Sequence, residues 1–136
     1  MNREALENAV TLAQKIWYVF AATANDDGLP HVAAAVKMTL ASNDGDIAVE
    51  AWYCPTTLIN LKQNPLISLI IWDSHADKGY QLLGETIKVE DMAMMNGYDP
   101  KSDIKSTLPQ VERRLIVRVK DVLIFSHAPH TDVKES

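Results

Sequence analysis

The sequence has 136 residues, of which 47% are hydrophobic and 23% charged, as in ordinary globular proteins. We therefore expect one domain, residues 1–136, that buries its own core. The formal charge of −5 and the scattered Lys and Arg residues argue against a nucleic-acid partner. The only cysteine, Cys54, forms no internal disulfide, and neither a signal peptide nor an apolar run of ~18 residues is found. We expect a cytoplasmic protein with no membrane partner.

A first helix is predicted from Arg3 to about Trp17, with Asn2 as its cap. Apolar residues recur there at three- and four-residue spacing, which indicates one buried face packed over a sheet. That face comprises Leu6, Ala9, Val10, Ala13, Ile16 and Trp17.

A strand over residues 18–24 and a turn over 25–30 lead to a second strand over 31–40. In this second strand, period-two alternation predicts a core face of Val32, Ala34, Val36, Met38 and Leu40. The opposite face has a shallow floor of alanines with a lysine near its end, at His31, Ala33, Ala35, Lys37 and Thr39. Such a face suits a flat ligand with an anionic tail, and equally a solvent-facing side with small residues.

The stretch 46–73 reads as a strand, a turn, a helix over 56–64 and a nearly continuous apolar strand over 66–72. Pro55, Thr56 and Thr57 stand at the start of the helix. Hydroxyls there cap the first turn, and the free N–H groups with the helix dipole also form a site for a phosphate. Both interpretations stay open on this stretch alone.

The remaining chain predicts a strand over 79–89 with a bulge at Gly84, and one short helix with loops over 91–110. A last strand over 115–125 precedes a mobile tail, about 126–136. Six strands at hairpin spacing with a few small helices predict a mainly β fold with flanking helices, an antiparallel six-stranded barrel.

Two further clusters were weighed as sites. His127, His130 and Asp132 have ligand chemistry but no further histidine or cysteine near them in the sequence, so we expect no metal. Cys54 precedes the predicted helix, where a thiol could be reactive, although a passive small residue explains it as well. No residue is assigned a catalytic role.

Two motifs then point to a known family. One is the turn that contains Ala22, Thr23, Gly28 and Pro30, and the other is the run NLKQNPLISL over 60–69. The two motifs occur here in the same order and at the same spacing as in that family. From Val19 to Val89 the chain resembles the pyridoxamine 5′-phosphate oxidase-like FMN-binding split barrels. The resemblance implies a split β-barrel that forms a homodimer, with FMN held at the subunit interface.

The resemblance also implies which residues hold FMN. The strand after the turn would line the flavin, the end of the next strand would adjoin it, the helix start would hold the phosphate and a glutamine would touch the ring. Thr56 and Thr57 stand where the oxidases carry Arg and Lys, so we expect weaker FMN binding than theirs. The residues that the resemblance implies for FMN binding are Ala33, Ala34, Ala35, Val36, Lys37, Met38, Glu50, Ala51, Thr56, Thr57 and Gln81.

The C-terminal segment, FSHAPHTDVKES, lacks the Arg- and His-bearing motifs of the authentic oxidases, so their specific activity is rejected. The leading hypothesis is an FMN-dependent oxidoreductase of unassigned substrate, with NAD(P)H as a candidate electron donor. The alternatives are a non-catalytic flavin- or haem-binding module and a ligand-free dimeric scaffold.

Overall fold

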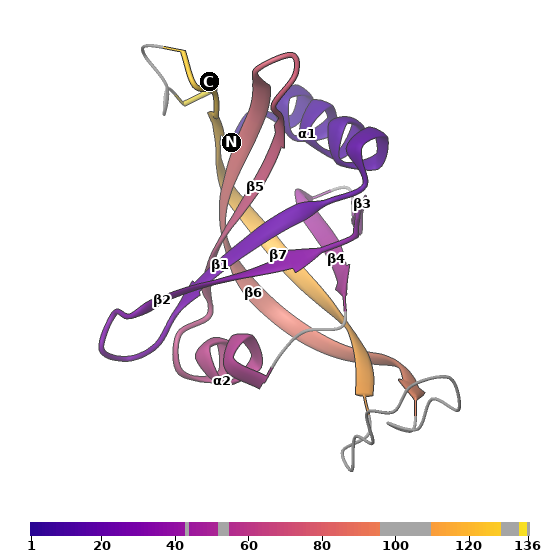
Figure 1. Cartoon of the computed structure of the whole chain (residues 1–136), viewed down its shortest axis with the longest axis vertical. Coiled ribbons are helices and arrows are strands. Elements are labelled where there is room, and N and C mark those ends of the chain that lie inside the picture. The colour runs from indigo at the N-terminus through magenta and orange to yellow at the C-terminus, as the bar shows by residue number, and fades with distance from the viewer. Residues whose placement is uncertain (43, 52–54, 96–109, 129–133, 136) are drawn as a thin grey trace.

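The computed structural model describes residues 1–42, 44–51, 55–95, 110–128 and 134–135 (Figure 1). Two helices and seven strands follow one another along these residues. They are α1 (Arg3–Ile16), β1 (Val19–Ala24), β2 (Pro30–Ala35), β3 (Lys37–Leu40), β4 (Asp46–Ala51), α2 (Pro55–Gln63), β5 (Leu66–Asp73), β6 (Lys78–Met95) and β7 (Gln110–Ile124).

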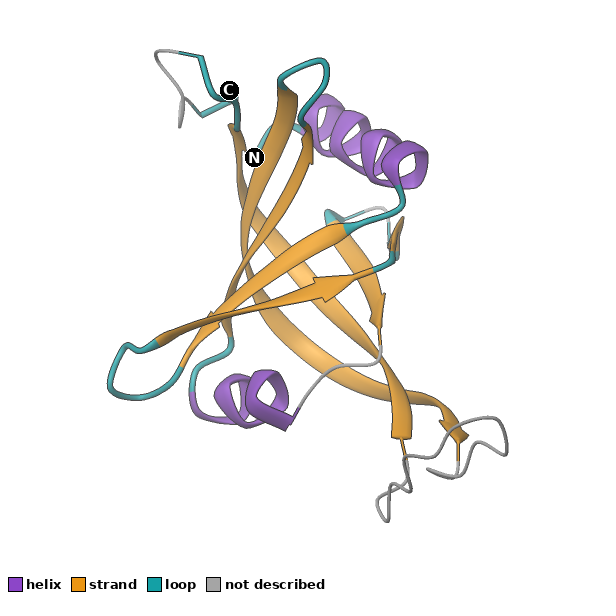
Figure 2. Cartoon of the chain, viewed as in Figure 1, coloured by secondary structure: helices purple, strands orange, loops and turns teal. Residues whose placement is uncertain are grey.

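All seven strands belong to one antiparallel sheet with the order β2-β1-β5-β6-β7-β4-β3. Its two edge strands, β2 and β3, are consecutive in the chain and are separated by Val36 alone. The sheet therefore curls until its edges meet, as the strands of Figure 2 show. Counted as one interrupted strand, β2 and β3 give the predicted six-stranded split barrel, which is confirmed.

The interruption at Val36 changes which side chains face the core. In β2 the buried side chain is Ala35, whereas in β3 it is Met38. The prediction of one continuous core face was wrong: Val32 is 60% exposed and Val36 58%, and Ala34 and Leu40 are exposed as well. Ala33 and Ala35 lie on the inner side of β2, where this strand contacts β4 across the barrel.

Helix α1 covers one end of the barrel, where it contacts β3, β5 and β6 (Figure 2). The side chain of Asn2 caps it by accepting a hydrogen bond from the N–H of Ala5 at 3.0 Å, as predicted. Trp17 was expected on the buried face but is 75% exposed. It adopts a left-handed backbone conformation, with φ 68°, just after the helix ends. This turn directs the chain into β1 and the indole away from the core.

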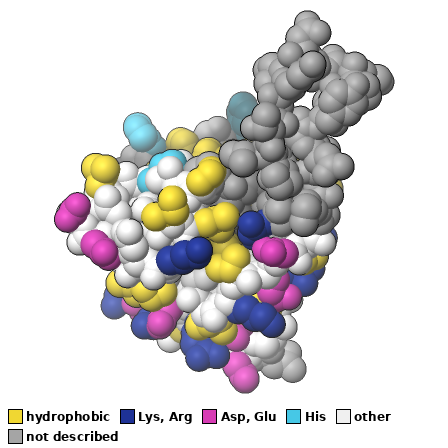
Figure 3. All heavy atoms as spheres, turned by 90° about the horizontal axis from the view of Figure 1, so that it is seen from below, with side chains coloured by type: hydrophobic (Ala, Val, Ile, Leu, Met, Phe, Trp, Pro, Cys, Tyr) yellow, Lys and Arg dark blue, Asp and Glu magenta, His cyan; other side chains and the backbone are white. Residues whose placement is uncertain are grey.

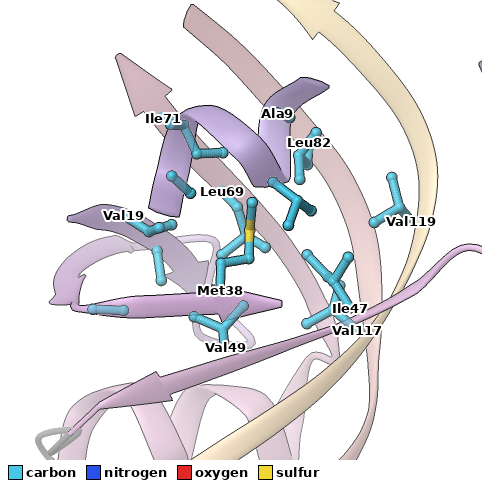
Figure 4. Packing of buried hydrophobic residues seen from close by; sticks show 14 of the residues in the cluster. Ala9, Val19, Met38, Ile47, Val49, Leu69, Ile71, Leu82, Val117 and Val119 are labelled. Carbon is cyan, nitrogen blue, oxygen red and sulfur yellow. The ribbon is translucent and has the colours of Figure 1, made fainter. Parts of the chain in front are cut away.

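The core fills the space between the sheet and α1. In Figure 4, Met38 lies among aliphatic side chains from β4, β5 and β7. Val49, Leu69 and Val117 are fully buried there. At the opposite end of the barrel, α2 packs against β1 and β2, so the two helices close different ends.

Strands β6 and β7 are longer than predicted. β6 continues to Met95 and β7 begins at Gln110, so both ends of the segment predicted as a short helix with loops are strand; residues 96–109 lie outside the described part. Long-range pairing with β7 overrode the weak local pattern. The predicted irregularity at Gly84 is confirmed by a register shift. A Cβ there would lie 2.5 Å from the carbonyl oxygen of Arg118.

The described end of the chain returns to β7. Lys134 forms an isolated bridge with Leu123, and the N–H of Glu135 donates to the carbonyl of Val122 at 2.9 Å. The tail predicted to be mobile is therefore attached at these residues, while 129–133 and 136 lie outside the described part. No helix of the described chain is long and apolar enough to cross a membrane.

Candidate functional site

A row of three charged side chains crosses β3, β4 and β7. Glu50 is paired with Lys37 on one side and with Arg114 on the other. One carboxylate oxygen of Glu50 lies 2.8 Å from Nη2 and 2.9 Å from Nε of Arg114. Its second oxygen lies 3.7 Å from Nζ of Lys37. We call this set of three residues the Lys37 row.

The Lys37 row arises from strict alternation in β4. Val49 of β4 points into the core, so its neighbour Glu50 points to the opposite face of the sheet. There the long side chain of Arg114 covers it, and Glu50 is only 7% exposed. Arg118 contacts Asp46 in the same way, with Nε 3.2 Å from Oδ1.

Sequence reasoning missed Arg114. The signal was present, because acidic residues at 46 and 50 face basic residues at 118 and 114 once β4 and β7 are paired antiparallel. That pairing joins segments far apart in the chain, so the pattern could be recognised only after the partner strand was known.

The charge of the Lys37 row is one unit positive, since two cations share a single carboxylate. Arg114 holds Glu50 closely, whereas Lys37 is mostly exposed and makes the longer contact. Its ammonium group is therefore the part of the row that an anion in solvent can reach. Cations at such a surface attract phosphates and carboxylates.

The start of α2 follows β4, the strand that carries Glu50, after a short connection. Ala51, the last residue of β4, precedes Pro55 by four peptide units, which span at most about 14 Å. Residues 52–54, with Cys54 among them, lie outside the described part. Proline suits the first position of a helix because its missing N–H would have no helical acceptor there.

The two threonines of α2 have different environments. The helix begins at Pro55, so Thr56 and Thr57 both lie in its first turn. Thr56 is exposed, whereas Thr57 is 0% exposed. A nearby buried contact, the amide of Asn60 donating to the hydroxyl of Thr23 at 3.2 Å, shows that this side of the helix is anchored to β1. Only Thr56 presents its hydroxyl to solvent.

The residues predicted to line the flavin also include both buried and exposed side chains. The side chains of Ala35, Met38 and Ala51 belong to the hydrophobic core, so they do not line an open cleft. Ala33 is half-buried against that core. Exposed side chains that could meet a ligand belong to Ala34, Val36 and Lys37.

Gln81 lies far from the Lys37 row within one chain. Its side-chain amide donates to the hydroxyl of Ser68 at 2.8 Å, on the outer face of the sheet. The β6 residue that pairs with Arg114 is Glu90, and about 30 Å of strand separates Gln81 from it. The structure thus brings Lys37 and Glu50 together but not Gln81.

An apolar surface covers the outer face of β1 and β2. Phe20 pairs with Ala34 on one side and with Ile70 on the other, and Ile70 pairs with Gln81. Phe20 is 40% exposed, and its ring lies 5.7 Å from that of Tyr18. We call this surface, with its exposed members Tyr18, Phe20, Val32, Ala34 and Val36, the outer apolar face.

A groove of about 440 Å³ continues the outer apolar face across β5 and β6. Its lining is mainly apolar, and it includes Ala22, Ser68 and Leu83. The end of the molecule seen from below in Figure 3 carries hydrophobic side chains with Lys, Arg, Asp and Glu interspersed. No group of three or more His, Cys, Asp or Glu that could hold a metal gathers among the described residues; His130 and Asp132 are not among them.

Comparisons with known proteins agree with this architecture. A family model described as pyridoxamine 5′-phosphate oxidase matches residues 5–119. No curated protein matches the chain.

Solved structures with the same fold have 10–16% sequence identity to this chain. A protein of Clostridium acetobutylicum related to general stress protein 26, of the pyridoxinephosphate oxidase family, has a TM-score of 0.64 at 13% identity, covering 100% of this chain and 96% of that one. HupZ of Group A Streptococcus has a TM-score of 0.61 at 16% sequence identity. The match covers 93% of this chain and 97% of HupZ. A pyridoxamine 5′-phosphate oxidase-related, FMN-binding protein of Nostoc punctiforme has a TM-score of 0.64 at 10% sequence identity. The match covers 91% of this chain and 83% of that protein.

Proposed function

Since this chain belongs to the pyridoxamine 5′-phosphate oxidase family, we propose that it is a flavoprotein that binds FMN beside the Lys37 row. The observation that carries the proposal is the exposed ammonium of Lys37, set one strand from the Glu50–Arg114 pair, with Glu50 on β4, the strand that leads by a short connection into α2. The FMN-binding description of the Nostoc relative supports the choice of ligand.

The phosphate of FMN would be held by the exposed side of this site. Thr56 offers a hydroxyl, α2 its free N–H groups and dipole, and Lys37 a charge. Neutral donors form weaker hydrogen bonds with a phosphate than charged ones do. Because Thr56 and Thr57 stand where the oxidases have a basic pair, binding should be weaker than theirs. Thr57 stabilises the helix from inside.

The flavin ring would lie against the exposed side chains of Ala34 and Val36, which border the outer apolar face. Contiguous exposed apolar surface marks interaction sites in soluble proteins. We propose that this face packs against a second copy to form a homodimer with FMN at the interface. Gln81 lies three strands across the sheet from Ala34, so we propose that it contacts the flavin held by the other copy.

The activity that we propose is that of a cytoplasmic FMN-dependent oxidoreductase with NAD(P)H as electron donor. When bound, FMN supplies the hydride chemistry. The chain would orient the ring through Ala34 and Val36, fix the phosphate through Lys37 and Thr56, and exclude water from one side of the ring through the subunit contact.

Titration of purified protein with FMN, followed by flavin fluorescence and absorbance, tests the binding. Saturable quenching is expected, with one FMN per chain. Anaerobic addition of NADPH should then bleach the bound flavin. Bound flavin that does not bleach with NADPH or NADH would refute the oxidoreductase with this donor, and absence of saturable binding would refute the flavoprotein.

A further inference from the structure

A second, separate cavity lies between α2 and the facing ends of β6 and β7. Its volume is about 270 Å³, slightly below the roughly 300–1,000 Å³ usual for ligand pockets. It therefore suits a small molecule. The six described residues that line it are Leu58, Leu61, Lys62, Val89, Asp91 and Arg113.

Arg113 gives this cavity its chemistry. Its Nε lies 3.0 Å from Oδ1 of Asp91, but its Nη1 is buried and has no hydrogen-bond partner among the described residues. A guanidinium group has only donors to offer, and a buried donor without an acceptor is unfavourable. Nη1 itself is enclosed by protein, but the side chain as a whole keeps 21% of its surface exposed and lines the cavity, so the cavity wall carries a guanidinium charge.

The cavity is independent of the Lys37 row. Arg113 pairs with Ala51, a core residue, so its side chain leaves the sheet on the core side. Arg114, the next residue, leaves it on the opposite side. Neighbouring arginines in the sequence therefore serve two different sites.

Charge and lining define the occupant. Arg113 and Lys62 contribute two positive charges, and Asp91, whose side chain is 75% exposed, contributes one negative charge, so one monoanion balances the cavity. Leu58, Leu61 and Val89 supply apolar walls. A planar acceptor matches the guanidinium fork better than a single atom does.

We propose that this cavity binds a small organic carboxylate with an apolar chain or ring. Its carboxylate would interact with the exposed part of the Arg113 guanidinium and with the ammonium of Lys62. Its apolar part would lie against Leu58, Leu61 and Val89.

Calorimetric titration of the full chain with acetate, butyrate, benzoate and inorganic phosphate tests this assignment. Affinity should rise from acetate to butyrate to benzoate, with at least about a tenfold gain for benzoate over acetate from the buried apolar area. Saturable benzoate binding at low-millimolar concentration supports the proposal. Equal affinities across the carboxylates, tighter binding of phosphate than of benzoate, or no benzoate binding would each overturn it.

Variants locate the site. Arg113→Met should weaken benzoate binding about tenfold or more, whereas the control Arg118→Met, on the opposite face of the same strand, should change it less than about twofold. If Arg113→Met does not fold, Lys62→Met and Arg113→Lys are milder substitutions that test the same site. Each is expected to weaken benzoate binding severalfold. Unchanged benzoate affinity in Lys62→Met and Arg113→Lys would refute the assignment. FMN titration of the same variants separates this result from the flavin site.

Discussion

Two nitrogens of Arg114 contact a single carboxylate oxygen of Glu50, Nη2 at 2.8 Å and Nε at 2.9 Å. This ion pair joins β4 to β7 and is largely shielded from water by the arginine side chain. The other carboxylate oxygen faces Lys37 at 3.7 Å. The pair therefore stabilises the sheet and also sets the position of the cation proposed to meet the FMN phosphate.

Arg114→Met should lower the free energy of unfolding by about 1–3 kcal/mol, because it leaves the carboxylate of Glu50 buried without its main donors. Denaturant unfolding measures this change. Adding Glu50→Gln should recover part of the loss, since the buried charge is then removed. Arg118→Met is the comparison: Asp46 is as buried as Glu50, but Arg118 is more exposed and makes a single, longer contact at 3.2 Å, so its loss should be the smaller of the two. Equal losses for the two arginines would contradict this view of Glu50.

The two threonines of α2 should respond differently to the same substitution. Thr57→Glu places a carboxylate in a fully buried position and should cost about 3 kcal/mol or more. Thr56→Glu lies at the exposed surface and should change stability by less than about 0.5 kcal/mol. The latter should nevertheless weaken FMN binding at least about tenfold, by repulsion of the phosphate.

Thermal unfolding and FMN titration of both variants check these outcomes. Thr56→Ser keeps a hydroxyl without adding charge, so it should retain FMN binding. If Thr56→Glu binds FMN as tightly as the unsubstituted chain, the phosphate is not held at this helix start.

A charge on the outer apolar face should separate the proposed dimer. Phe20→Glu places a carboxylate at the centre of that face, and desolvating it on association is unfavourable. We expect the mass measured by light scattering to fall to that of one chain and FMN affinity to fall with it. Ile59→Glu is the control, because Ile59 is 54% exposed but lies on α2. Dimers that persist in Phe20→Glu would place the interface elsewhere.

Acid should weaken the attachment of the C-terminal segment. The backbone N–H of His127 donates to Oδ1 of Asp77 at 2.6 Å, and this bond holds the pKa of the Asp77 carboxyl below its ordinary value of 3.8. A carboxyl with a lowered pKa in the folded state stabilises the fold above its unfolded pKa, and this stability is lost as pH falls through the folded pKa. The loss should therefore occur below about pH 4.

Asp77→Asn keeps an oxygen that can accept from His127 but removes the titrating group. Between about pH 5 and the acid limit of folding, the unsubstituted chain should lose more unfolding free energy than Asp77→Asn does. Unfolding curves measured at a series of pH values check this difference. Parallel pH profiles for the two proteins would show that Asp77 does not contribute to acid unfolding.

Local sequence patterns predicted much of the architecture. The apolar spacing and the Asn2 cap predicted α1, and the apolar run over 66–72 predicted β5, because these signals need only neighbours in the chain. Family motifs predicted the split barrel. The break at Val36 was not predicted, because it arises where one strand changes partner from β1 to β4, and the partners are set by long-range pairing.

The candidate site was predicted only in part. Lys37 and Thr56 are exposed and could meet a ligand, whereas Glu50, Thr57 and Met38 are buried. Alternation with period two divides a strand into two faces without saying which face the rest of the chain covers. Arg114 was not predicted as part of the site because its partner, Glu50, is distant in the sequence.

The sequence by itself thus determined the mainly β class, the helix over 56–64 and a last strand over 115–125, whereas Arg113 and Arg114 fall before that predicted strand. In the structure β7 begins at Gln110, and its extended backbone places the two arginines on opposite faces. Only the tertiary structure decided that Arg113 borders a cavity while Arg114 covers Glu50. The physical reason is that side-chain direction is a local property of the extended backbone, whereas burial depends on which distant strand or helix packs against each face.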